Sequence, residues 1–79
     1  MTNSEKYDQA FIETIGVTAD QLNADLLYQS VPAWDSVGHM QLVAALEDAF
    51  DIMLDTDDII DLSSYDKGKE ILAKYDVGL

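Results

Sequence analysis

The stretch AWDSVGHMQLVAALEDAFDI, residues 33–52, decides how this chain folds. From Ser36 onward its apolar residues recur at steps of three and four, which is the spacing of a helix that buries one face. Asp35 stands at the N-cap position, where its carboxylate can accept hydrogen bonds from the free N–H groups of the first turn. The pattern therefore predicts a helix from about Ser36 to Phe50. Its residues with core spacing are Leu42, Val43, Leu46 and Phe50.

Another helix is predicted earlier in the chain, so that the helix from Ser36 to Phe50 is the second in chain order. In SEKYDQAFIETIG, residues 4–16, the apolar residues again follow helical spacing, and Gly16 sits where a left-handed C-cap residue belongs. Thr2 or Ser4 can cap its start. The apolar residues that step by four are Tyr7, Phe11 and Ile15.

Residues 17–35 connect these two helices and are too apolar for a free linker. A structureless loop of this length would be unusual inside a compact domain. We expect an ordered crossover with a helical turn near Asp20 to Leu26, pinned to the core by its leucines. We expect Trp34 to form a lid at the edge of the core.

The acidic stretch DTDDIID, residues 55–61, predicts a short helix that carries Ile59 and Ile60 and is capped by Thr56 or Asp57. A run of carboxylates of this kind could also belong to a calcium-binding loop. An EF-hand loop needs an oxygen ligand at its fifth place and a glycine at its sixth, and here both places hold isoleucine. A dedicated calcium site is therefore not expected, and loose binding of divalent cations stays open.

A last helix follows, in which Ser63 and Asp66 have the spacing of a capping box and Gly68 weakens the helical pattern. Its apolar residues are Tyr65, Ile71, Leu72 and Tyr75. No segment alternates with the two-residue period of a half-buried strand. The sequence thus predicts a single all-α domain over residues 1–79, a small bundle of three main helices plus one short helix.

The composition restricts the kinds of partner. Sixteen Asp and Glu face four Lys among 79 residues, a net charge of −12, which disfavours nucleic acid and anionic membranes. The chain has no cysteine, so its own side chains supply no thiol chemistry. With a polar start and no long apolar run, we expect a cytoplasmic protein, and the mutual repulsion of its charges favours a monomer.

Ser36 is the residue on which the functional interpretation depends. A hydroxyl in the first turn of a helix faces solvent, close to free N–H groups and a partial positive charge, an environment that tolerates a phosphate. From spacing alone, the better explanation of the pair Asp35–Ser36 is simply the start of a helix, because most Asp-Ser pairs have no further role.

The stretch from residue 34 to residue 52 resembles the attachment-site helix of the acyl carrier protein family, in which an Asp-Ser-Leu-type motif opens the second helix. The apolar run, the acidic pair and the ending Phe-Asp-Ile also match. The resemblance implies an acyl-carrier-like fold and a covalent 4′-phosphopantetheine on Ser36, transferred from coenzyme A by a phosphopantetheinyl transferase that recognises Asp35. The arm's thiol would carry acyl or aminoacyl groups as thioesters between biosynthetic enzymes. The protein would then be a phosphoprotein and a shuttle, not an enzyme.

The resemblance also assigns two surfaces. One is a docking strip along the second helix, for a loading ligase, synthase or acyltransferase with a basic docking surface. The docking strip consists of Val37, Met40, Gln41, Ala44, Glu47, Asp48 and Asp51. The other is a cleft that would shelter an acyl chain, lined by Leu42, Leu46, Phe50 and Ile59. Without the resemblance, the acids of the strip are equally well explained as solvated residues at a helix end.

After the serine, the sequence differs from the pattern of the carrier proteins of fatty-acid synthesis. Where those carry extra acids after the serine, this chain reads Val-Gly-His-Met-Gln, residues 37–41. The residues at positions Gly38 and Gln41 resemble those of D-alanyl carrier proteins. The residues before Asp35, VPAW (31–34), lack the Gly-Gly that is typical of peptidyl carriers. We expect a specialised stand-alone carrier. The sequence does not choose between fatty-acid, polyketide, aminoacyl and surface-polymer cargo.

Two other classes of function differ in how well the sequence supports them. An unmodified acidic helical adaptor, which binds proteins through the same strip, stays open as the alternative. A hydrolase built from Ser36, His39 and Asp35 is disfavoured, because one exposed helical turn cannot orient nucleophile, base and orienting acid together. We expect His39 to be a surface residue beside the arm.

Overall fold

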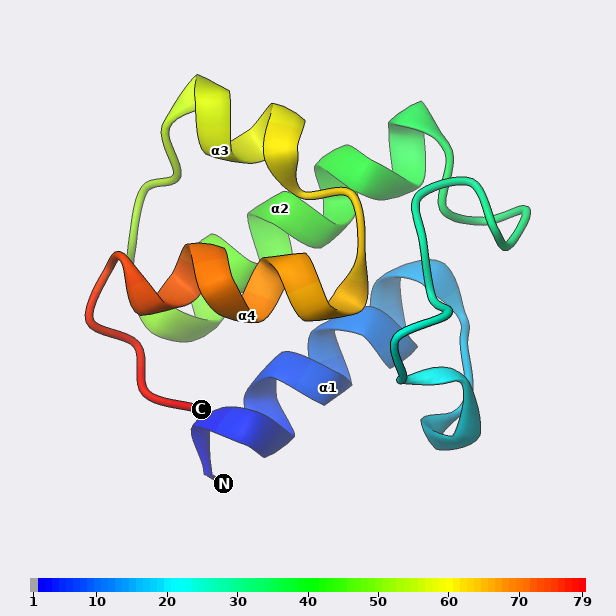
Figure 1. Cartoon of the computed structure of the whole chain (residues 1–79), viewed down its shortest axis with the longest axis horizontal. Coiled ribbons are helices and arrows are strands. Elements are labelled where there is room, and N and C mark those ends of the chain that lie inside the picture. The colour runs from blue at the N-terminus through cyan, green and yellow to red at the C-terminus, as the bar shows by residue number, and fades with distance from the viewer. Residues whose placement is uncertain (1) are drawn as a thin grey trace.

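The computed structural model describes residues 2–79 and is all-helical, as the sequence predicts (Figure 1). Within that range, pairing of the strand type is confined to an isolated antiparallel bridge between Leu27 and Ser64. The helices are α1 (Asn3–Ile15), α2 (Ser36–Phe50), α3 (Thr56–Asp61) and α4 (Tyr65–Ala73), with a single 3-10 turn, η1 (Ala19–Gln21), between α1 and α2.

Helix α1 begins and ends as its sequence predicts. Thr2 is the N-cap, and it exchanges hydrogen bonds with Glu5 in a capping box, each at 3.1 Å. Gly16 closes the helix in the left-handed conformation, with its N–H donating to Ile12. Ser4, the alternative cap, lies inside the helix instead.

The core is built around aromatic side chains from three parts of the chain. Phe11 of α1 lies at its centre. Its ring is edge-on to the rings of Trp34 and of Tyr65 in α4, with centroid distances of 5.5 and 5.4 Å. Tyr7, also fully buried, donates from its hydroxyl to the Tyr65 carbonyl at 2.5 Å. Trp34 has no exposed surface, so the prediction of a lid at the core edge is wrong. A large apolar ring with a partner for its N–H is most stable when it is fully buried.

The crossover before α2 is ordered, but its helical part is shorter than predicted. Only η1 is helical, and it ends before Leu26. Leu26 is buried, whereas Leu27 is half exposed, so the leucines do not all pin the segment. The backbone holds it as well: Tyr28 N–H donates to Ser63 at 2.8 Å, and Tyr65 N–H donates to Leu26 at 2.9 Å. The crossover is thereby fixed to the start of α4.

The two short helices begin one or two residues away from the predicted positions. The N-cap of α3 is Asp55 rather than Thr56 or Asp57. The N-cap of α4 is Ser64, which accepts from Lys67 N–H at 2.9 Å, rather than Ser63. Neighbouring Ser and Asp residues have similar capping ability, so tertiary contacts decide which of them caps the helix.

Gly68, which weakens the helical pattern of α4, has a packing role. A side chain there would collide with the Tyr7 hydroxyl, so glycine lets α4 lie directly against α1. The start of α1 also meets the last residues of the chain: the Asn3 side-chain amide donates to the Gly78 carbonyl at 2.9 Å (Figure 1). No helix formed by residues 2–79 is long and apolar enough to cross a membrane.

Candidate functional site

Ser36 is the first residue of α2, and it is exposed. Asp35 is the N-cap in an extended conformation, and its Oδ1 accepts from Gly38 N–H at 2.9 Å, as the sequence predicts. The Asp35 carbonyl accepts the first helical hydrogen bond, from His39 N–H at 2.8 Å. The serine hydroxyl thus stands at the positive end of a 15-residue helix, where unsatisfied N–H groups favour an anion.

Gly38 brings the preceding loop onto the start of this helix. It is buried, and a Cβ at this position would collide with the Ala33 carbonyl oxygen. In the sequence Gly38 is only a marker of subtype. In the structure it has a packing role: it allows the loop to turn tightly before Ser36.

Tyr28 reaches Ser36 from the crossover. Its hydroxyl oxygen lies 3.4 Å from Ser36 Oγ. Its half-buried ring packs edge-on against His39 at 5.3 Å and against Trp34 at 6.2 Å. Sequence reasoning missed Tyr28 as a site residue. Its only signal in the sequence is an aromatic residue among the apolar residues of the crossover, which does not reveal what it contacts.

His39 is a half-buried connector, so the prediction of a surface histidine is wrong. The Trp34 indole N–H donates to His39 Nδ1 at 3.0 Å, and His39 Nε2 lies 2.8 Å from the Ile59 carbonyl oxygen. Because indole only donates and a carbonyl only accepts, this arrangement requires the proton on Nε2. Both ring nitrogens are engaged away from Ser36, so His39 is not placed to act as its general base.

The docking strip lies on the solvent side of α2. Val37 and Met40 are 66% and 56% exposed, values that are high for apolar side chains. Glu47 is half buried and partly committed, since its Oε2 accepts from Leu54 N–H at 2.9 Å. The other members, Gln41, Ala44, Asp48 and Asp51, are exposed. Near the C-terminal end of α2 the strip borders a surface pocket of about 460 Å³, lined by Ala44, Glu47, Asp48, Asp51, Ile52 and Met53.

The residues predicted to line an acyl-chain cleft divide into two groups. Leu42 and Leu46 are fully buried in the core, whereas Phe50 and Ile59 are half buried at its edge. The His39 bond to the Ile59 carbonyl joins α2 to the end of α3 beside them. An acyl chain that reached Leu42 or Leu46 would therefore have to displace packed side chains. The cleft stays a prediction.

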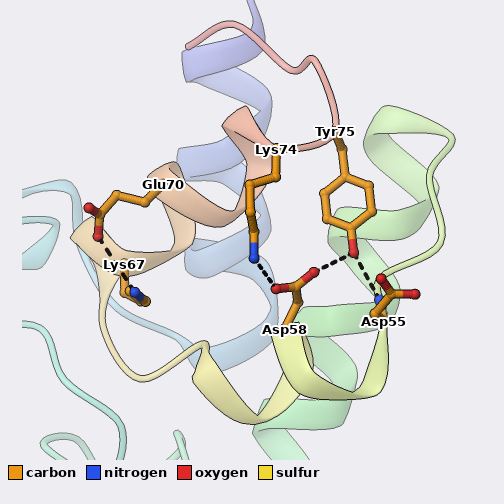
Figure 2. A network of polar contacts seen from close by, with 6 residues as sticks. All are labelled: Asp55, Asp58, Lys67, Glu70, Lys74 and Tyr75. Carbon is orange, nitrogen blue, oxygen red and sulfur yellow. Dashed lines mark hydrogen bonds and ion pairs between the residues drawn. The ribbon is translucent and has the colours of Figure 1, made fainter.

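The acidic run of α3 contains one residue that behaves differently from the rest. Asp58 is buried, and its carboxylate binds the Lys74 ammonium group and the Tyr75 hydroxyl, the latter at 2.5 Å (Figure 2). The Tyr75 hydroxyl in turn accepts from Asp55 N–H at 2.9 Å. Hydrogen bonds from Lys74 and then Tyr75 hold the pKa of Asp58 below its usual value, and the same contact raises the pKa of Lys74. These contacts join α3 to the C-terminal end of α4.

Among residues 2–79, no three His, Asp or Glu side chains are arranged to hold a metal ion. Comparison of the chain with protein-family models, with curated proteins and with solved structures gives no match.

Proposed function

We propose that this protein is a carrier that bears 4′-phosphopantetheine on Ser36 and delivers acyl or aminoacyl groups to biosynthetic enzymes. The observation that carries the proposal is the exposed Ser36 hydroxyl at the N-terminus of α2, set directly after its capping residue Asp35. The sequence around it resembles the attachment motif of acyl carrier proteins, and the helical architecture agrees with that resemblance.

The residues around Ser36 fit the proposed group. Its phosphate would lie at the positive end of α2, where the first-turn N–H groups have no intrahelical acceptor. Asp35 already satisfies the Gly38 N–H, and its carboxylate is exposed for recognition by a phosphopantetheinyl transferase. When bound, the group supplies the thiol that a cysteine-free chain lacks, on which cargo is held as a thioester.

The docking strip supports a protein partner with a basic surface. Exposed Val37 and Met40 lie close to Ser36 in sequence, while Asp48 lies in the last turn of the same helix and Asp51 is its C-cap. In such an interface the apolar contacts contribute affinity, while opposite charges steer association and fix orientation. An acyltransferase, synthase or ligase that loads the arm would use this strip.

The experiment that tests the proposal is modification by a transferase. The purified protein is incubated with coenzyme A and a broad-specificity phosphopantetheinyl transferase, and its intact mass is measured. We expect the mass to rise by one phosphopantetheine in the wild type and to stay unchanged in Ser36→Ala.

The matched control is Ser4→Ala, which removes another exposed serine near the N-terminus of a helix. This variant should be modified like the wild type. If several transferases leave the wild-type mass unchanged, the carrier proposal fails, and the unmodified acidic adaptor becomes the better explanation of the strip.

A further inference from the structure

The loop in front of α2 places a phenol beside the proposed attachment point. The Tyr28 hydroxyl lies 3.4 Å from Ser36 Oγ, although eight residues of chain separate them. An ordinary O–H···O hydrogen bond spans about 2.7–2.8 Å. The contact with the serine itself is therefore weak, and the phenol proton is available to a stronger acceptor bonded to that serine.

The position of Tyr28 is fixed by the fold. Its N–H donates to Ser63 at 2.8 Å, and its ring rests edge-on against His39 and Trp34. His39 is itself held by a hydrogen bond at each ring nitrogen, accepting from Trp34 at Nδ1 and donating to the Ile59 carbonyl from Nε2. The hydroxyl is thus presented by a packed support, and binding through it requires little further ordering of the side chain.

We infer that Tyr28 is a phosphate-binding residue, whose O–H donates a hydrogen bond to a non-bridging oxygen of the phosphodiester on Ser36. The inference rests on the proposed attachment at that serine. The phosphate brings acceptor oxygens just beyond Oγ, and hydrogen bonds to an ionised acceptor are shorter and stronger than neutral ones. Tyr28 would hold the base of the arm in addition to the first-turn N–H groups.

This contact has a role that the helix end alone does not fill. The N–H groups of α2 attract the phosphate to the helix end, whereas a hydrogen bond from a second, separate element also restricts its rotation about the serine bond. With its base held at two points, the arm leaves the protein in a preferred direction. Tyr28 is a neutral donor, so it can hold the anion without adding to the net charge of −12.

The test is the ³¹P NMR spectrum of the modified protein. Wild type, Tyr28→Phe, Tyr28→Leu and Tyr75→Phe are each converted with excess transferase until the intact mass shows one arm per chain. We expect the ³¹P resonance to shift in Tyr28→Phe, which removes only the hydroxyl. It should stay at the wild-type position in Tyr75→Phe, which removes a hydroxyl that binds Asp58 instead.

The outcomes separate this inference from the proposed function. A wild-type chain that takes no arm overturns both. If both proteins are fully modified and the ³¹P resonance is the same in wild type and Tyr28→Phe, the phosphate contact alone is overturned. A resonance that moves only in Tyr28→Leu has the same meaning, because the ring rather than the hydroxyl would then be responsible. If Tyr28→Phe cannot be modified at any transferase concentration, the hydroxyl acts in attachment and the inference as stated is wrong.

Discussion

At the scale of single residues, Gly38 shows how the site depends on a side chain that is absent. Gly38→Ala places a methyl group against the Ala33 carbonyl oxygen, and either the loop or the first turn of α2 must move. We expect the free energy of unfolding to fall by about 1–3 kcal/mol, as for other overpacked positions. Denaturant unfolding measures the change.

The control for this variant is Gly78→Ala. Nothing lies within 4 Å of a Cβ built at Gly78, so that substitution should leave stability nearly unchanged. Equal effects from the two substitutions would show that the close approach at Gly38 is not needed.

His39 is the second residue whose role can be measured. His39→Phe keeps a ring in the same space but leaves the Trp34 indole N–H and the Ile59 carbonyl without partners. A buried polar group left unsatisfied costs about 1–3 kcal/mol. We expect a loss of stability in that range, followed through the fluorescence of Trp34, the only tryptophan of the chain.

His39→Gln provides the comparison, because its side-chain amide offers one acceptor and two donors. It should recover part of the lost stability and keep the Trp34 indole proton hydrogen-bonded in the NMR spectrum. Wild-type stability in His39→Phe would contradict the role given to these two hydrogen bonds.

At the scale of elements, the contact of Asp58 with Lys74 and Tyr75 joins α3 to the end of α4 (Figure 2). Since the native pKa of Asp58 is lowered, its contribution to stability is present above the unfolded value of about 3.9 and is lost as pH falls through the native pKa. For Lys74 and Tyr75 the native pKa is raised. Their contributions are therefore lost as pH rises above about 10.

The measurement compares Asp58→Asn with the wild type across pH. We expect the variant to be less stable at pH 7 and the difference to shrink below about pH 4, where the unfolded carboxylate takes up a proton, until at lower pH the native carboxylate is protonated as well. Asp57→Asn removes the same charge from an exposed neighbour and should not destabilise the protein. If both variants behaved alike, net charge rather than the buried contact would explain the effect.

The long elements could be predicted from sequence, and the contacts between short ones could not. Helices α1 and α2 each carry a full apolar period and a recognisable cap, so their boundaries follow from local information. The inward turn of Asp58 depends on Lys74, sixteen residues later, and no local pattern in residues 55–61 distinguishes it from Asp57.

The same limit applies at the candidate site. Asp35 and Ser36 belong to the local pattern of a helix start, so the sequence alone predicts their positions at the N-cap and in the first turn correctly. Tyr28 and the buried state of Trp34 were missed, because both depend on how the crossover folds back over α2. An aromatic residue in a loop has no periodic neighbours that indicate the direction of its side chain.

At the scale of the whole molecule, the net charge of −12 spread over 79 residues opposes compaction. Salt screens such repulsion, with a Debye length that falls from about 30 Å at 0.01 M to about 3 Å at 1 M. We expect the midpoint of thermal unfolding to rise with NaCl concentration.

Magnesium and calcium chlorides, compared with NaCl at equal ionic strength, identify the cause. Screening and diffuse attraction to the carboxylates give a gradual rise without saturation, as expected where residues 2–79 form no metal-binding group. A gain that saturates at micromolar cation would reveal a dedicated site and contradict this expectation.

The meeting of Asn3 and Gly78 has a consequence for engineering. Because the chain ends lie side by side, at an edge away from the start of α2, a short peptide can join them into a ring (Figure 1). The ring can then be reopened in an exposed loop, giving a circular permutant with the same core. The unit can likewise be inserted into a surface loop of a host protein, with Ser36 still projecting outward.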